Sequence, residues 1–225
     1  MTRSCVFVVA VLALGLGKTA SAQGEQGGHT HWWMELDPSW YAGAGLGQSS
    51  FDKWLDVIDD GSLGSRNADD RDTGMRFFAG VSFGRYLAVE LGYADFGEGS
   101  FRAQSDGSGS VWSAGPVAQV VEVEGVDLAL LGKLPLTGDW ALFGKAGLVS
   151  WDVGVGIAGD TQCCGPVAFK ADDAGTDLSY GGGVQYDGLG PLRLVAEYGV
   201  VRFSSENVIE DAEVDSLGIS IAYRF

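Results

Sequence analysis

The chain closes on Ser216-Leu217-Gly218-Ile219-Ser220-Ile221-Ala222-Tyr223-Arg224-Phe225. Every odd-numbered position from Leu217 to Phe225 is apolar, and every even-numbered position is small or polar. Side chains of a β-strand alternate between two faces, so a period of two indicates a strand with one apolar face. The last ten residues therefore predict a strand whose two faces meet different surroundings.

The same alternation recurs upstream. It is clear in 74–84, 87–94, 178–186 and 192–201, and weaker in 40–48, 121–134 and 140–153. Together with the last segment these make eight candidate strands. In 140–153, Trp151 is out of phase with Lys145 if the tryptophan belongs to the apolar face, so we expect a β-bulge there.

The connections between these segments alternate in length. Short turns are expected at 84–86, 135–139 and 187–191, and long ones at 52–72, 97–118, 157–176 and 204–213. All five prolines lie outside strand interiors, as ladder hydrogen bonding requires. Short turns on one side and long loops on the other are typical of an outer-membrane barrel. We therefore predict an all-β, eight-stranded, antiparallel, up-and-down transmembrane β-barrel with both termini periplasmic and long extracellular loops.

Charged residues decide which face meets lipid. A Lys or Arg facing the bilayer midplane costs ~2–4 kcal/mol, so basic side chains within the strands should point inward. That choice sends the apolar faces outward and gives a lumen charge network, with Asp127 and Lys133 as further candidates. Its predicted members are Arg76, Glu90, Lys145 and Glu197. A soluble lipocalin-like barrel or sandwich is the alternative, and it would have to bury those four charges in a core.

Aromatic residues gather where the periplasmic rim is expected, as in the girdle of a membrane barrel. These are Trp40, Phe83, Trp140, Tyr186, Tyr223 and Phe225.

Composition narrows the function classes. The 36 glycines among 225 residues follow no three-residue period, which excludes collagen. A net charge of −16 argues against nucleic acid and against a polybasic membrane patch. No apolar stretch after the N-terminus is long enough for a spanning helix.

The N-terminus resembles a secretory signal in three parts. Arg3 gives a basic start, Val6–Leu16 is apolar, and Ala20-Ser21-Ala22 is a small-residue cleavage site. We expect a signal peptide over 1–22, a periplasmic tail over 23–38 and the barrel over 39–225.

Two stretches and the last strand together resemble the OmpA-like transmembrane domain family. They are 73–97 with Thr73-Gly74-Met75-Arg76-Phe77-Phe78-Ala79-Gly80, 180–187 with Tyr180-Gly181-Gly182-Gly183, and 214–225. The resemblance implies an eight-stranded barrel of a Gram-negative cell envelope, inserted by the outer-membrane assembly machinery. That machinery is thought to read the last strand, so Leu217, Ile219, Ile221, Tyr223 and Phe225 are both the lipid-facing set and the assembly signal. Some family members carry a peptidoglycan-binding domain after the barrel, and this role is not expected here.

Eight strands enclose a lumen that side chains can fill. We therefore expect a structural or surface-interaction role, with outer-membrane lipids and lipopolysaccharide as partners and a monomeric state. The alternative is a narrow, porin-like, low-conductance pore. An enzyme is not expected, because the only histidines, His29 and His31, lie in the N-terminal tail. That pair could bind a metal weakly, but no dedicated metal site or cofactor is expected.

Two loop features complete the candidates. Cys163 and Cys164 are adjacent, and we predict either a vicinal disulfide or two free thiols, since adjacent cysteines close only a strained ring. Two long loops are dense in carboxylates, at 52–72 and 206–213, and could bind Ca²⁺ or Mg²⁺ bridged to lipopolysaccharide phosphates. They lack the ordered ligand spacing of a calcium loop, so a solvated surface is the simpler interpretation.

Overall fold

The computed structural model describes residues 38–51, 60–203 and 212–225. Within them are nine strands: β1 Pro38–Ser50, β2 Leu63–Asp69, β3 Arg71–Phe83, β4 Leu87–Ser105, β5 Gly115–Pro135, β6 Trp140–Thr161, β7 Gly165–Leu189, β8 Leu192–Phe203 and β9 Ala212–Arg224. No helix in these ranges is long and apolar enough to cross a membrane. The predicted signal peptide and tail, with His29 and His31, lie outside the described residues.

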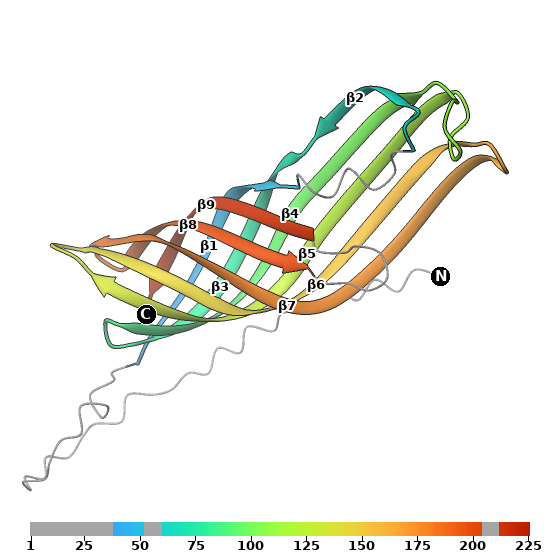
Figure 1. Cartoon of the computed structure of the whole chain (residues 1–225). Coiled ribbons are helices and arrows are strands. Elements are labelled where there is room, and N and C mark those ends of the chain that lie inside the picture. The colour runs from blue at the N-terminus through green and yellow to red at the C-terminus, as the bar shows by residue number, and fades with distance from the viewer. Residues whose placement is uncertain (1–37, 52–59, 204–211) are drawn as a thin grey trace, which may run out of the picture. The chain divides into compact units, whose positions relative to one another are not determined.

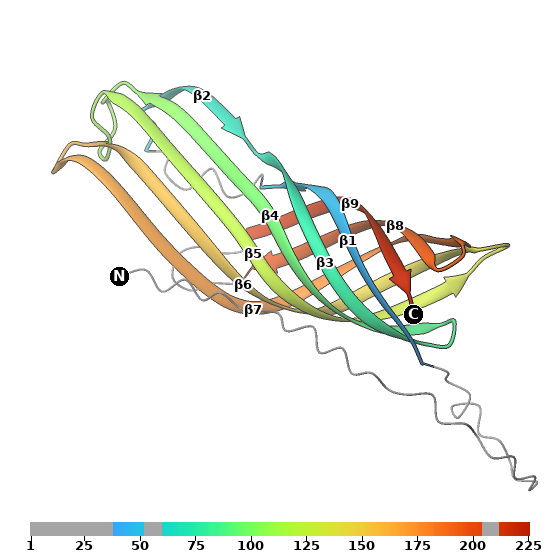
Figure 2. The same cartoon turned by 180° about the vertical axis from the view of Figure 1, so that it is seen from behind.

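Eight of the strands form a closed antiparallel ring. Each ring strand pairs with its sequence neighbour, and β9 pairs with β1 to close the circle (Figures 1 and 2). The short β2 precedes β3 by a single residue and continues its line along β4, with Leu63 opposite Ser105. The predicted eight-stranded up-and-down barrel is therefore confirmed.

The apolar faces of the strands look out of the barrel. On β9 the side chain of Ile219 is 72 % exposed, whereas the inward carboxylate residue Glu90 on β4 is only 4 % exposed. Outward apolar residues on β5 run from Val126 to Leu134, a span of the length that a tilted strand needs to cross a bilayer. We call this outward band the apolar belt.

The three short turns lie at one end of the barrel. The start of β1 and the end of β9 lie at the same end. Phe225 donates its backbone N–H to Trp40 O at 2.9 Å, and Arg224 donates to Pro191 O at 2.8 Å. The turns themselves hold Gly84, Gly138 and Gly190 at φ values of 63°, 70° and 68°, which only glycine adopts without strain.

Two of the predicted long loops are wrong, and the described part of a third, 52–72, holds β2 and the start of β3. The segments 97–118 and 157–176 are largely strand, because β4 continues to Ser105, β6 continues to Thr161, and β7 begins at Gly165. The reason is an inversion of the polar pattern on the same strand. Between Gly125 and the short turn after Pro135, the apolar residues Val126 to Leu134 of β5 point outward. On the other side of Gly125, Val121 and Val123 point inward while Glu122 and Glu124 point outward.

The predicted bulge at Trp151 is also wrong. Trp151 pairs in unbroken register with Gly125 on β5 and Gly175 on β7. It shares the inner face with Lys145 and is 1 % exposed, because beyond the apolar belt the inner face takes the large apolar side chains. The register shifts lie elsewhere, at Gly64/Asn67, Asp95/Glu98 and Tyr186/Leu189.

Strands β4 to β7 extend beyond the rest of the ring. They have 19, 21, 22 and 25 residues, against 13, 12 and 13 for β1, β8 and β9 (Figures 1 and 2). Pairing of β7 with β8 begins only at Ser179 opposite Val201. The parts of β2 and of β4–β7 that lie past the apolar belt are called the extension below.

Candidate functional site

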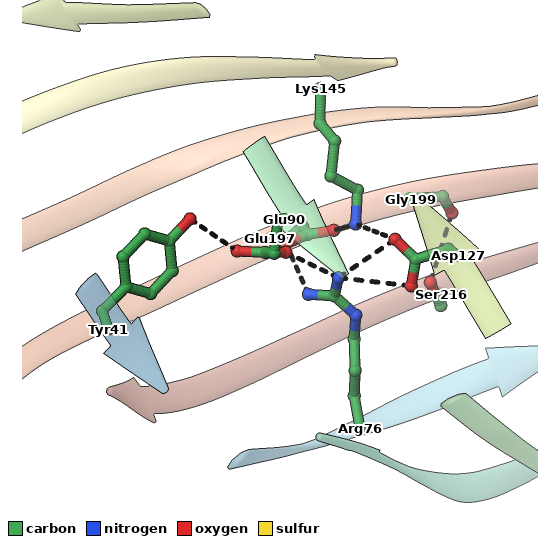
Figure 3. A network of polar contacts seen from close by, with 8 residues as sticks. All are labelled: Tyr41, Arg76, Glu90, Asp127, Lys145, Glu197, Gly199 and Ser216. Carbon is green, nitrogen blue, oxygen red and sulfur yellow. Dashed lines mark hydrogen bonds and ion pairs between the residues drawn. The ribbon is translucent and has the colours of Figure 1, made fainter. Parts of the chain in front are cut away.

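The centre of the lumen holds a charged layer built around Arg76 of β3. Its Nη2 lies 2.6 Å from Glu90 Oε1 of β4 and 3.3 Å from Asp127 Oδ2 of β5. Its Nη1 lies 3.5 Å from Glu197 Oε2 of β8 (Figure 3). One guanidinium therefore ties together three carboxylates from three strands.

Lys145 of β6 completes the charged layer from the opposite wall (Figure 3). Its Nζ lies 2.6 Å from Glu197 Oε1 and 3.8 Å from Asp127 Oδ2. Tyr41 of β1 adds a neutral partner, donating its hydroxyl to Glu90 Oε2 at 3.1 Å. Six of the eight ring strands thus contribute a side chain to one polar network, which crosses the lumen from wall to wall.

Glycine makes room for this network on the inner face. A Cβ on Gly92 would lie 2.3 Å from Asp127 Oδ1 and 2.8 Å from Arg76 Nη2, closer than real atoms approach. This explains why the charged faces of the strands are also the glycine-rich faces.

The four residues predicted for the lumen are thus brought together, and Asp127 joins them. Lys133 does not. Its Nζ donates to Ser82 Oγ at 2.8 Å, nearer the short-turn end.

A second polar cluster near that end was not predicted. Asp187 accepts from Arg193 Nε at 2.7 Å and from Gln185 Nε2 at 2.9 Å, and Arg224 Nη1 is 3.7 Å away. The sequence placed Asp187 in a turn and gave it no partner. The signal available was the inward parity of Arg193 and Gln185 on the two strands that flank the turn.

Beyond the charged layer, toward the extension, the lumen is filled by an apolar plug. Its buried members are Phe51, Phe96, Val121, Val123, Val149, Trp151, Val153, Val155, Val201, Phe203 and Val214. The Trp151 and Phe203 rings meet edge to face at 5.2 Å, and Trp151 Nε1 donates to Asp177 Oδ2 at 2.8 Å. Beside the charged layer is a cavity of about 20 Å³, room for about one water molecule. The lumen is therefore packed rather than open.

The outer surface carries the residues assigned to the last strand. Leu217, Ile219, Ile221 and Tyr223 are exposed on the outside of β9, and Phe225, one residue after β9, is exposed as well. At the other edge of the belt, tyrosines donate to carboxylates on neighbouring strands: Tyr93 to Glu124 at 2.6 Å and Tyr198 to Asp215 at 2.8 Å. This second aromatic rim was not predicted.

The loop candidates fall into three groups. Cys163 and Cys164 are exposed in the turn between β6 and β7, and the choice between a vicinal disulfide and two free thiols stays a prediction. Much of the two acidic loops, including Asp52, Asp56, Glu206 and Glu210, lies outside the described residues. Among the described residues, no group of three or more His, Cys, Asp or Glu side chains is placed to hold a metal ion.

Asp60 is an acidic-loop residue with a clear structural task. Its Oδ1 accepts from the N–H and hydroxyl of Ser62, and its Oδ2 accepts from the N–H groups of Val111 and Trp112 at 2.8 and 3.2 Å. It therefore joins the β1–β2 connection to the β4–β5 loop. The Ser62 hydroxyl above all, and the backbone donors with it, hold the pKa of Asp60 well below its usual range.

We expect this junction to open in acid. A carboxyl whose folded pKa is depressed contributes fully above its unfolded pKa of about 4, and that contribution is lost as pH falls through the lower folded pKa. The amide resonances of Val111 and Trp112 should therefore stay unchanged from pH 7 to about 4 and shift below it. Asp60→Asn should remove the acid transition, and an unaltered transition in that variant would assign it to another carboxyl.

Fold and site together define a transmembrane β-barrel of the outer-membrane type, with an apolar belt outside and a filled, charged lumen inside. The chain belongs to the OmpA-like transmembrane domain family, whose model matches residues 36–225. This is a family of non-enzymatic membrane barrels, in agreement with the expectation from the sequence.

Solved structures share the fold at low sequence identity. Neisserial surface protein A is 12 % identical, with 84 % of this chain and 99 % of that chain covered and a TM-score of 0.52. The outer membrane protein OprG from Pseudomonas aeruginosa is 13 % identical, with 85 % and 97 % covered and a TM-score of 0.54. A comparison with curated proteins found no match.

Proposed function

We propose that this outer-membrane barrel has a structural or surface-interaction role and a lumen that does not conduct. The observation that carries the proposal is the filling of the lumen. Arg76 and Lys145 bridge carboxylates across its full width, and the apolar plug lies directly beyond them. An ion crossing the barrel would have to break the ion pairs and then displace packed aromatic rings.

The proposed orientation places the short turns and both termini in the periplasm and the extension outside the cell. This is supported by the common rule for outer-membrane barrels, in which periplasmic turns are short. It puts the exposed Tyr223 and Phe225 of the last strand on the side where the assembly machinery would read them. The predicted signal peptide over 1–22 fits the same route.

The extension supports the surface-interaction part of the proposal. Its polarity is that of a protein in water, with Glu122, Glu124 and Asp152 outward and valines inward. A sheet of this kind belongs beyond the hydrocarbon, next to lipopolysaccharide and open to external partners. The ring is closed throughout the described part of the apolar belt, which fits a monomer, because a barrel has no strand edge there for another copy.

Planar-bilayer recording tests the closed lumen. Wild-type protein should give no conductance steps, and Glu197→Ala and Lys145→Ala should remain silent because the apolar plug is untouched. Heat-modifiable gel migration verifies that each variant is folded. Conductance in the wild type would establish the narrow pore instead, and conductance only in the variants would show that the charged layer is a gate.

A further inference from the structure

The outer part of β7 has one side without a partner strand. Its residues 165–178 pair with β6 on one side, whereas pairing with β8 begins only at Ser179 opposite Val201 (Figures 1 and 2). We call the other side of residues 165–178 the free edge, because no strand of the described ranges pairs with it. An edge of this kind offers a row of backbone N–H and C=O groups to a further strand.

The even-numbered residues of β7 present their backbone groups to the free edge. In an antiparallel ladder a residue turns both its N–H and its C=O to one side, and the next residue turns to the other side. Pro166 is opposite Asp160, whose carbonyl oxygen accepts from Ser113 in the loop before β5 and so points away from β7. The Ala174 N–H donates to the Asp173 carboxylate rather than to β6. Pro166 and Ala174 therefore turn to the free edge, as do the even-numbered residues between them.

The charges along the free edge are self-complementary. Lys170 and Asp172 are consecutive even-numbered residues, and both are exposed on the outer face of the extension. Neither belongs to any of the ion pairs found among the described residues. If two copies of this strand meet in antiparallel fashion about a twofold axis at Ala171, Lys170 of each copy comes directly opposite Asp172 of the other. Because both residues turn their backbone groups to the free edge, the two ladders also match.

The length of the free edge suits this register. With the axis at Ala171, Gly165 of one copy lies opposite Asp177 of the other, just short of Ser179, where β8 takes over the pairing. On the inner face the second strand would cover Phe169, which is 60 % exposed. Opposite charges directly across a pair of strands are stabilising, whereas like charges are destabilising. The register about Ala171 therefore satisfies the backbone and the side chains together.

We propose that the free edge of β7 binds the free edge of a second copy of this chain, in an antiparallel ladder centred on Ala171. Two copies in one membrane have strands that run in the same direction, so this ladder joins copies in two facing membranes, and the chain stays a monomer within each membrane. The inference rests on the proposed function, which places the extension outside the cell, and it names a second copy as the partner of that surface.

The net charge of −16 opposes the approach of two copies without preventing the pairing. Charges more than about 8 Å apart are largely screened at physiological ionic strength. Residues directly opposite in a ladder have Cβ atoms only about 4.5–5.5 Å apart, so the pairs of Lys170 with Asp172 are screened much less. Self-association should therefore strengthen as the salt concentration rises from about 0.01 M to about 0.15 M.

The test uses the folded full-length barrel in lipid vesicles and in detergent. Wild-type protein should cluster the vesicles that carry it, measured by light scattering, and should dimerise in detergent, measured by sedimentation equilibrium. Lys170→Asp and Asp172→Lys should each weaken dimerisation at least about tenfold, because each replaces two attractive pairs by two repulsive ones. An equal mixture of the two variants should recover dimers, since every Asp of one variant then faces a Lys of the other.

Asp152→Lys is the matched control. It makes the same change of charge on the outer face of β6, away from the free edge, and should dimerise like the wild type. Heat-modifiable gel migration verifies that each variant is folded.

Three results would overturn the proposal. A wild type that stays monomeric in detergent would leave the free edge to a strand of another protein. A mixture that dimerises no better than either variant alone would remove the register about Ala171. Dimers in detergent without clustering of vesicles would exclude the arrangement across facing membranes. None of these results depends on whether the lumen conducts, so the closed lumen and this pairing fail separately.

Discussion

Arg76→Ala should be the most destabilising single change in the lumen, lowering the free energy of unfolding by about 3–5 kcal/mol. The guanidinium contacts Glu90, Asp127 and Glu197, and its removal leaves three carboxylates with Lys145 as their only basic partner among the ion pairs described. Among the described residues, Glu90 would then keep one hydrogen-bond partner, the hydroxyl of Tyr41. An unpaired buried charge is far more costly than a lost surface contact.

The matched control is Arg202→Ala. Arg202 of β8 pairs with Glu213 at 3.1 Å, but its side chain is 67 % exposed. Exposed ion pairs contribute about 0–1 kcal/mol, so this variant should unfold close to the wild type. Both are measured by urea titration of tryptophan fluorescence in lipid vesicles. If the two variants were destabilised equally, the charged layer would have no special part in holding the barrel together.

The ring of eight strands can be predicted from the sequence, because one rule governs every strand inside the apolar belt. A basic side chain facing hydrocarbon is costly, so Arg76, Lys145 and Arg193 fix the inner face and Leu217 or Ile219 then fixes the outer one. The same parity brings Glu90 and Glu197 to the lumen, Glu90 from β4 beside Arg76 and Glu197 from β8, which does not pair with β3. Which side chains point into the lumen therefore follows from the alternation alone.

The alternation does not predict the extension because the rule reverses outside the membrane. Beyond Gly125 the surroundings of β5 are aqueous, so Val121 and Val123 turn inward and Glu122 and Glu124 outward. The inward and outward alternation continues through this point, but the apolar side chains change faces, so the strand predicted over 121–134 stops short of its true start at Gly115. The bulge expected at Trp151 is wrong for the same reason, since a tryptophan near the belt can belong to either face.

The sequence also does not predict contacts that depend on how far a side chain reaches. Asp187 is expected in a short turn, but it lies near the end of β7, and its carboxylate extends to Gln185 on the same strand and to Arg193 on β8. Gln162 likewise reaches the carbonyl groups of a loop some fifty residues earlier, such as that of Trp112. Such pairs are set by how far the strands rise and how they are staggered, which periodicity does not specify.

Leu130→Arg and Leu134→Arg should differ sharply although both positions lie on the same face of β5 and have nearly equal exposure, 57 % and 60 %. Leu130 is in the middle of the apolar belt, opposite Val89 and Ala146, and Leu134 is beside the short turn that follows Pro135. Arginine costs about 2–4 kcal/mol at the bilayer midplane and about 0–1 kcal/mol near the interface. Leu130→Arg should therefore lower the free energy of unfolding by about that larger amount, and Leu134→Arg hardly at all.

Leu130→Ala and Leu134→Ala measure how much stability is lost with the leucine side chain itself, and this amount is subtracted from the effect of each arginine. The free energies of unfolding are compared by reversible urea unfolding in lipid vesicles. At Leu134 the long arginine stem can also carry its charge to the interface, which widens the difference between the two sites. In water both arginines would be harmless, since each position is more than half exposed. A depth-dependent cost on one exposed face thus arises only if hydrocarbon surrounds the belt, and equal small effects at both positions would mean that these leucines face water.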